Sequence, residues 1–169
     1  MVQRRPSRLF DGSRWSAFKL AVAVLGLGLM LETFAAPLAW AARPLKLVVF
    51  GDSLTAGLGV APADAFPLQL QAALRTRGHA VEVINAGVSG DTVATALERF
   101  DWAIPEDADT VIVELGANDG LRGIDPAQTR ATFARLLDRL KARKIPVLLA
   151  GMKAPRNYGT DFATQFDAL

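Results

Sequence analysis

The chain has 169 residues, of which 51% are hydrophobic and 21% charged, and it contains no cysteine and one histidine. This composition excludes two full domains, a disordered scaffold, a disulfide framework, and a thiolate or multi-histidine metal centre. The first 42 residues hold five basic and two acidic side chains, whereas the remainder holds 14 basic and 15 acidic. The part that we expect to fold is therefore nearly neutral and predicts no nucleic-acid partner.

Residues 1–42 have the layout of a secretory signal peptide. A basic stretch is followed by the apolar run from Leu20 to Leu31 and by small residues that end in Ala39-Trp40-Ala41. We expect cleavage after Ala41, or after Ala42 as the alternative, and export to the periplasm or the exterior. The apolar run is shorter than the roughly 20 residues of a spanning helix. An uncleaved leader that anchors the chain in a membrane is the second interpretation, and no other membrane contact is expected.

Residues 43–169 alternate between strand and helix patterns and are expected to form one domain. Short apolar runs bounded by Gly, Asn or Pro predict four buried parallel strands, at residues 46–50, 81–85, 110–115 and 146–150. Amphipathic spacing predicts helices between and after them, at residues 65–76 with Asp64 as cap, 92–100, 127–144 with Asp125 as cap, and from about 161 onward. This order predicts an α/β domain with three α/β/α layers and a parallel sheet in the middle.

Three of the predicted strands end in polar, glycine-rich turns. These are Gly51-Asp52-Ser53-Leu54-Thr55, the segment from Asn85 to Asp91, and Gly116-Ala117-Asn118-Asp119-Gly120. Taken singly, each is ordinary turn chemistry: Ser53 would be a helix cap, Gly87 a turn glycine and Asn118 an Asx-turn residue. Because the carboxyl ends of parallel strands meet at one edge of a sheet, the three turns together indicate a functional site there.

As a set, these turns resemble the motif blocks of the SGNH hydrolases, also called the GDSL family. The likeness runs from about Leu45 to Leu169 and is nearest to the branch of thioesterase I, lysophospholipase L1 and the secreted arylesterases. The resemblance implies a flavodoxin-like parallel sheet, no metal and no organic cofactor. It implies substrates that are small esters or thioesters, lysophospholipids included.

The same resemblance implies roles for particular residues. Ser53 would be the nucleophile, and the backbone N–H groups of Ser53 and Gly87 with the carboxamide of Asn118 would form the oxyanion hole. A glycine at position 87 would let substrate approach its N–H closely. The carboxylates of the three turns are expected to accept backbone N–H bonds and hold the turns, at positions Asp52, Asp91 and Asp119.

The sequence departs from the family at the general base. A serine nucleophile needs a base, usually a histidine oriented by a carboxylate, and the family takes both from a D-x-x-H block that this sequence does not contain. His79 is expected at the opposite, amino end of the second strand. We therefore expect the catalytic Asp and His to be absent, the chain to be a shortened product without the last strand and helix of the fold, and esterase activity to be negligible.

Several interpretations remain open at this point. Glu114 is either a buried, paired carboxylate or a strand residue that faces a helix. The same edge chemistry would also serve a carbohydrate O-acetyl esterase. A non-catalytic secreted remnant that binds acyl groups or a partner is the alternative to an enzyme. The predicted fourth strand would be partly uncovered if the fold lacks its last strand.

Overall fold

The computed structural model describes residues 43–153 and 156–169. The predicted leader, residues 1–42, lies outside these ranges. Within them, no helix has both the length and the apolar character that crossing a membrane requires.

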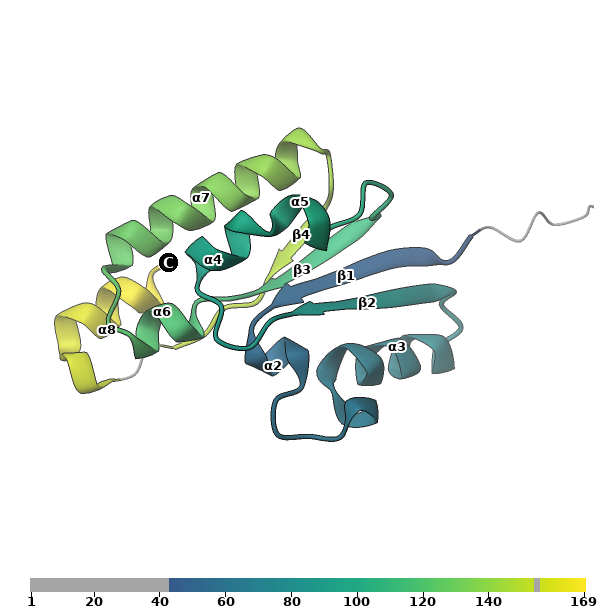
Figure 1. Ribbon diagram of the computed structural model, residues 1–169, viewed down its shortest axis with the longest axis horizontal. Helices are drawn as coiled ribbons and strands as arrows, with labels where there is room; N and C mark the ends of the chain where they lie inside the picture. Colours follow the sequence, from purple (N-terminus) through teal and green to yellow (C-terminus); the bar gives the residue numbers. More distant parts are fainter. Residues whose placement is uncertain (1–42, 154–155) are drawn as a thin grey trace, which may run out of the picture. The chain divides into compact units, whose positions relative to one another are not determined.

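A four-stranded parallel sheet forms the centre of the domain (Figure 1). Its order is β2-β1-β3-β4, which fits the flavodoxin-like sheet that the family resemblance implied. The strands run over β1 Leu45–Gly51, β2 Val81–Gly87, β3 Thr110–Glu114 and β4 Val147–Leu149. The predicted strands are thus all present, although the first two extend further toward the predicted turns than expected.

The register of the sheet places the three predicted turns at the same level. Gly51 at the end of β1 pairs with Gly87 at the end of β2 and with Glu114 at the end of β3. Because all three strands are parallel, the chain leaves each of them on the same side. The turns that follow therefore begin next to one another.

Helices cover both faces of the sheet (Figure 1). On one face lie α2 Ser53–Ala56, the 3₁₀ turn η2 Pro62–Asp64 and α3 Phe66–Thr76, and on the other α4 Val93–Glu98, α5 Phe100–Ala103 and α7 Pro126–Ala142. The remaining elements are α6 Ala117–Leu121, η3 Arg156–Tyr158 and α8 Thr160–Asp167. The three-layer α/β/α arrangement is confirmed.

The long helix α7 forms as the sequence predicts. Asp125 caps it by accepting a 2.8 Å hydrogen bond from the Ala127 amide, and Pro126 occupies its first turn. Its apolar stripe packs against β1, β3, α4 and α5 in the hydrophobic core, where Leu136 and Leu140 are completely buried. Burial of this stripe, rather than helix propensity, holds α7 in place.

Two helix predictions need correction. Asp64 does not cap α3, because it belongs to the preceding 3₁₀ turn and Ala65 occupies the cap position without a side-chain hydrogen bond. The helix predicted at residues 92–100 is two helices, α4 and α5, that meet at Arg99. Arg99 has φ −96° and ψ 7°, and its side chain turns into the protein instead of continuing the solvent-facing side of a helix.

Strand β4 differs from the other three in its environment. All three of its residues are exposed, with Leu148 at 61%. The strand pairs with β3 through the register Val111↔Val147 to Val113↔Leu149, and it lies at the edge of the sheet. The prediction of a buried fourth strand was wrong, whereas the expectation that this strand would be partly uncovered agrees with its exposure. Helices of the described residues do not cover β4 as they cover β1 and β3.

Candidate active site

The turn after β1 presents Ser53 at the start of a helix. Asp52, which is completely buried, caps α2 by accepting a 3.0 Å hydrogen bond from the Leu54 amide. The chain can turn this tightly because position 51 has no side chain: a Cβ there would lie 2.0 Å from Thr55 Oγ1. Ser53 is therefore not the helix cap. Its hydroxyl and its amide have no hydrogen-bond partner among residues 43–153 and 156–169.

The turn after β2 packs directly on that helix. A Cβ at Gly87 would lie 2.3 Å from the amide nitrogen of Ala56, so the absence of a side chain allows close approach of α2. The Val88 amide donates to the carbonyl of Gly51 at 3.0 Å and fastens this turn to the end of β1. The turns after β1 and β2 are thus in contact at two places, and backbone atoms of both turns make each contact.

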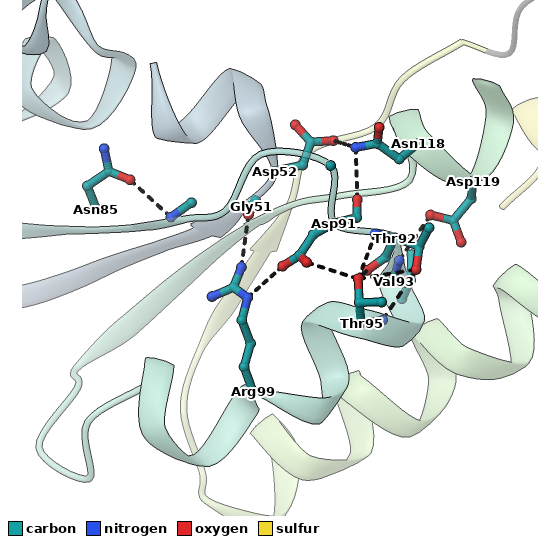
Figure 2. Close-up of polar contacts among 12 residues, drawn as sticks. Gly51, Asp52, Asn85, Asp91, Thr92, Val93, Thr95, Arg99, Asn118 and Asp119 are labelled. Carbon is teal, nitrogen blue, oxygen red and sulfur yellow. Dashed lines mark hydrogen bonds and ion pairs between the residues drawn. The ribbon is translucent and has the colours of Figure 1, made fainter. Parts of the chain in front are cut away.

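The expected role of Gly87 as an oxyanion donor is not supported by its contacts. Its amide donates a 3.0 Å hydrogen bond to Asn85 Oδ1, two residues earlier at the end of β2 (Figure 2). The close approach that we expected of substrate is made instead by α2. Another amide of the turn, that of Gly90, donates to no acceptor in the described part of the chain. Gly90 has φ +89°, and its carbonyl accepts a 2.8 Å hydrogen bond from Arg122 Nη2.

The third turn brings Asn118 to the other two. Gly116, at φ +109°, is the N-cap of α6, and Asn118 is the second residue of that helix. Its side-chain Nδ2 donates to the carbonyl of Asp91 at 2.9 Å and to Asp52 Oδ2 at 3.2 Å (Figure 2). Both partners are acceptors, which fixes the orientation of the carboxamide. One side chain thus connects the Ser53 turn to the turn that follows β2.

The three turn carboxylates act as structural acceptors, with one difference from expectation. Asp52 accepts the Leu54 amide, and Asp119 Oδ2 accepts the Val93 amide at the start of α4 at 3.0 Å. The Asp91 carboxylate differs in that it accepts no backbone N–H of the described residues: Oδ1 accepts Thr95 Oγ1 at 2.9 Å and Oδ2 accepts Arg99 Nε at 2.6 Å. Burial raises the pKa of Asp119 above its usual range, and the Val93 bond opposes that shift.

Glu114 ends β3 directly beside the serine turn. Its Oε2 accepts a 2.8 Å hydrogen bond from Thr55 Oγ1, and its backbone carbonyl accepts the Asp52 amide at 3.2 Å. The other carboxylate oxygen, Oε1, is buried and has no partner among the described residues. Burial raises the pKa of Glu114, because the charged form loses its hydration. The carboxylate is thus partly paired, the first of the two interpretations left open by the sequence.

His79 lies away from these turns. It precedes β2 and is exposed, whereas the turn of Gly87 follows the same strand, seven residues long. Such a strand spans about 20 Å. In the described part of the chain, no group of three His, Asp or Glu side chains gathers as a metal site would require.

Sequence reasoning missed two residues that organise the site, Arg99 and Gly90. Arg99 is 6% exposed and lies between α4 and α5, whose buried positions are apolar. An arginine at a buried position among apolar residues needs a buried partner. The sequence pattern could therefore have indicated that Arg99 is buried and paired. The sequence gives little indication of the role of Gly90, because its positive φ and its unbonded amide arise only in the folded turn.

Residues 49–168 match the GDSL-like Lipase/Acylhydrolase family. The chain belongs to this family. Among curated relatives, the esterase TesA of Pseudomonas aeruginosa is 39% identical over 121 residues, covering 71% of this chain and 60% of the relative. The thioesterase 1/protease 1/lysophospholipase L1 of Escherichia coli K12 is 36% identical over 130 residues, covering 76% and 61%.

Solved structures of the GDSL family share this fold. The SGNH-hydrolase family esterase AlinE4 superposes with a TM-score of 0.71 at 44% identity, covering 74% of this chain and 68% of that one. The TesA crystal structure gives 0.67 at 38% identity, covering 72% and 68%. The chain spans about 60% of the length of the curated relatives that it matches.

Proposed function

We propose that this chain carries the nucleophile and the oxyanion donors of a serine ester hydrolase. The contact that carries the proposal is the carboxamide of Asn118, which bonds both the Asp52 side chain and the Asp91 carbonyl. It holds a neutral N–H donor against Asp52, and the next residue, Ser53, has a hydroxyl and an amide that are unbonded within the described ranges. Acyl transfer needs this combination of a free hydroxyl and donors already in place.

In this mechanism the Ser53 hydroxyl oxygen bonds to the carbonyl carbon of an ester or thioester and gives its proton to solvent water. The carbonyl oxygen becomes an oxyanion, which accepts hydrogen bonds from the Ser53 amide and from Asn118 Nδ2. The bond to the alcohol or thiol then breaks, that group leaves with a proton from water, and a second water molecule hydrolyses the acyl-serine. The 3.2 Å bond from Asn118 to Asp52 is the longer of its two and is the one that an oxyanion would replace. Loss of one such donor typically costs about 3 kcal/mol of barrier.

We propose Gly90 rather than Gly87 as the second backbone donor. Gly87 has a single N–H, which it already donates to Asn85 Oδ1 at 3.0 Å, whereas Asn118 has two N–H groups and can exchange the longer of its bonds. The amide of Gly90 is unbonded in the described segments and precedes Asp91, whose carbonyl holds Asn118. The hydrogen bond from Arg122 to the Gly90 carbonyl holds this turn in place.

The substrates that we propose are small aryl or short-acyl esters, acyl thioesters and lysophospholipids. Relatives with 36–39% identity are named as an esterase, an arylesterase, a thioesterase and a lysophospholipase, which supports an acyl group as the common feature. The proposed reaction uses no metal and no organic cofactor.

We also propose that the turnover of this chain is low. The sequence has one histidine, His79, and it lies at the amino end of β2, away from Ser53. Catalysis without a member of the triad is limited to about 10³- to 10⁴-fold over water. Whatever hydrolysis occurs would then depend on Ser53 and Asn118 but not on His79.

Hydrolysis of p-nitrophenyl acetate by the full chain tests both parts of the proposal. We expect a slow rate that falls in Ser53→Ala and in Asn118→Ala and that is unchanged in the matched control His79→Ala. A rate typical of enzymes that Ser53→Ala abolishes would overturn the missing-base argument. Equal rates for the parent and Ser53→Ala, with no fluorophosphonate adduct on Ser53 by mass spectrometry, would leave a folded remnant that binds acyl groups without turnover.

A further inference from the structure

We propose that Arg99 is a positioning residue that holds the Ser53 turn and the Asp91 turn in register. This inference rests on the proposed function, because the register matters for the donors around a bound carbonyl. Arg99 itself touches neither Ser53 nor Asn118 through a hydrogen bond. It acts on the Ser53 turn through the Gly51 carbonyl and on Asn118 through Asp91, whose carbonyl accepts the Asn118 hydrogen bond.

The guanidinium of Arg99 joins two turns that are far apart in sequence. Its Nε donates to Asp91 Oδ2 at 2.6 Å, and its Nη2 donates to the carbonyl of Gly51 at 3.0 Å (Figure 2). Its central carbon lies 4.4 Å from the ring centroid of Phe50, so the planar group stacks on the core below the turn. One side chain thus contacts the end of β1 and the turn that follows β2.

Each of these two contacts leads directly to a proposed catalytic group. The Gly51 carbonyl belongs to the peptide bond that precedes Asp52, whose amide is held by the Glu114 carbonyl at 3.2 Å. This peptide is therefore fixed on both of its sides, and Ser53 follows it. On the other branch, Asp91 offers its own carbonyl to Asn118 Nδ2 at 2.9 Å.

Burial makes the Arg99–Asp91 ion pair resist reorientation. The two side chains are 7% and 10% exposed. A charge at that depth is tolerated only when its partner and its remaining hydrogen-bond sites are satisfied, and here Thr95 Oγ1 occupies the second oxygen of Asp91. Moving one turn relative to the other would break a buried charged contact, so the pair resists that motion.

The geometry requires arginine and not simply a positive charge. Arg99 uses a ring-stacked planar fork whose Nε and Nη2 point at two separate acceptors. A lysine ammonium is a single point donor on a flexible stem and cannot reproduce that fork or its stacking. Arg99→Lys therefore keeps the charge but loses the simultaneous contact with Gly51 and Asp91.

Arg143 offers a matched control on the same side of the sheet. It donates to the backbone carbonyls of Ile104 and Pro105, and it lies 5.6 Å from the Phe100 ring centroid. It thus combines two carbonyl contacts with an aromatic face, as Arg99 does, but it touches none of the three turns. Arg143→Lys reports the cost of losing such a fork away from the site.

Fluorophosphonate labelling of Ser53 in the full chain tests the inference, with folding checked by circular dichroism and urea denaturation. For Arg99→Lys we expect the maximal labelling rate constant to fall at least tenfold at an unchanged half-saturating probe concentration. For Arg143→Lys we expect less than a twofold change in both. Equal labelling in folded Arg99→Lys and in the parent would overturn the positioning role, as would an equal loss in Arg143→Lys.

A second measurement separates this inference from the proposed function. In ¹⁵N-resolved NMR spectra, Arg99→Lys is expected to shift or broaden the Asn118 side-chain amide signals and the backbone amide signals of Ser53 and Gly90. Arg143→Lys is expected to leave them in place. If the parent is not labelled at Ser53, the proposed function fails, but the NMR signals still test the positioning role. Unchanged signals in Arg99→Lys would then overturn that role.

If Arg99→Lys does not fold, the variant Asp91→Asn is measured in its place. That change removes the buried charge and leaves the Asp91 backbone in place.

Discussion

The side chain of Asn118 donates a 2.9 Å hydrogen bond to the backbone carbonyl of Asp91, although 27 positions separate the two residues. The contact crosses from the turn after β3 to the turn after β2. It exists because the parallel register brings both strand ends to one level. Asn118 Nδ2 also donates to Asp52 Oδ2, so the same side chain contacts the turn after β1 as well.

Replacement of Asn118 tests how far this carboxamide stabilises the fold. Asn118→Ala leaves the Asp91 carbonyl and Asp52 Oδ2 without their shared donor, which we expect to lower the free energy of unfolding by about 1–3 kcal/mol. Asn118→Asp is expected to cost more, because it places a second carboxylate against Asp52. Urea denaturation at neutral pH measures both. An Asn118→Asp protein as stable as Asn118→Ala would contradict the account.

Replacement of Gly87 tests whether this glycine serves packing. In Gly87→Ala the new Cβ would overlap the backbone of Ala56, which cannot move aside as a flexible side chain would. We expect a loss of about 1–3 kcal/mol or more in the free energy of unfolding. Gly151→Ala is the control, because no atom lies within 4 Å of its Cβ position. Equal stability of the two variants would refute the packing role.

The pH dependence of stability tests the buried state of Glu114. Burial raises its pKa above the ordinary value of 4.5, so the folded protein binds this proton more tightly than the unfolded chain does. The free energy of unfolding therefore falls as pH rises from about 4.5 through the raised pKa. Glu114→Gln is expected to remove that part of the slope and to be at least as stable as the parent at pH 7.

Urea denaturation of the parent and Glu114→Gln between pH 4 and pH 7 measures this difference. The carboxylates of Asp107 and Asp109, whose pKa values are lowered by hydrogen bonds from Lys46 and Arg43, act in the opposite direction. Both proteins share them, so their contribution cancels in the comparison. Identical slopes for the two proteins would show that Glu114 is not desolvated as described.

The leader prediction is tested by the mass of the exported product. When the full sequence is expressed in a bacterial host, we expect a mature chain that begins at Ala42, because Ala39 and Ala41 provide the small residues of an A-x-A site. Intact-mass spectrometry of the periplasmic fraction measures this. Ala41→Arg should block the cleavage. A full-length product in the membrane fraction would favour the uncleaved anchor.

The sequence by itself predicted the sheet and the edge at which the three turns meet. The strand runs are short, apolar and bounded by turn residues, and they alternate with amphipathic helices, which leaves few arrangements other than a parallel three-layer fold. Since parallel strands end at one edge, the turns of Ser53 and Asn118 could be assigned to the same site before any coordinates. This reasoning holds because strand and helix periodicity are local properties of the chain.

Only the tertiary structure decided which groups of those turns are free and which are occupied. The amide of Gly87 is donated to Asn85 Oδ1, and the buried Arg99 divides a predicted helix in two to reach Asp91 and Gly51. Exposure of β4 likewise follows from its place at the edge of the sheet. Local sequence patterns do not record which donor meets which acceptor, because these contacts join segments that lie tens of residues apart and form only when the layers pack.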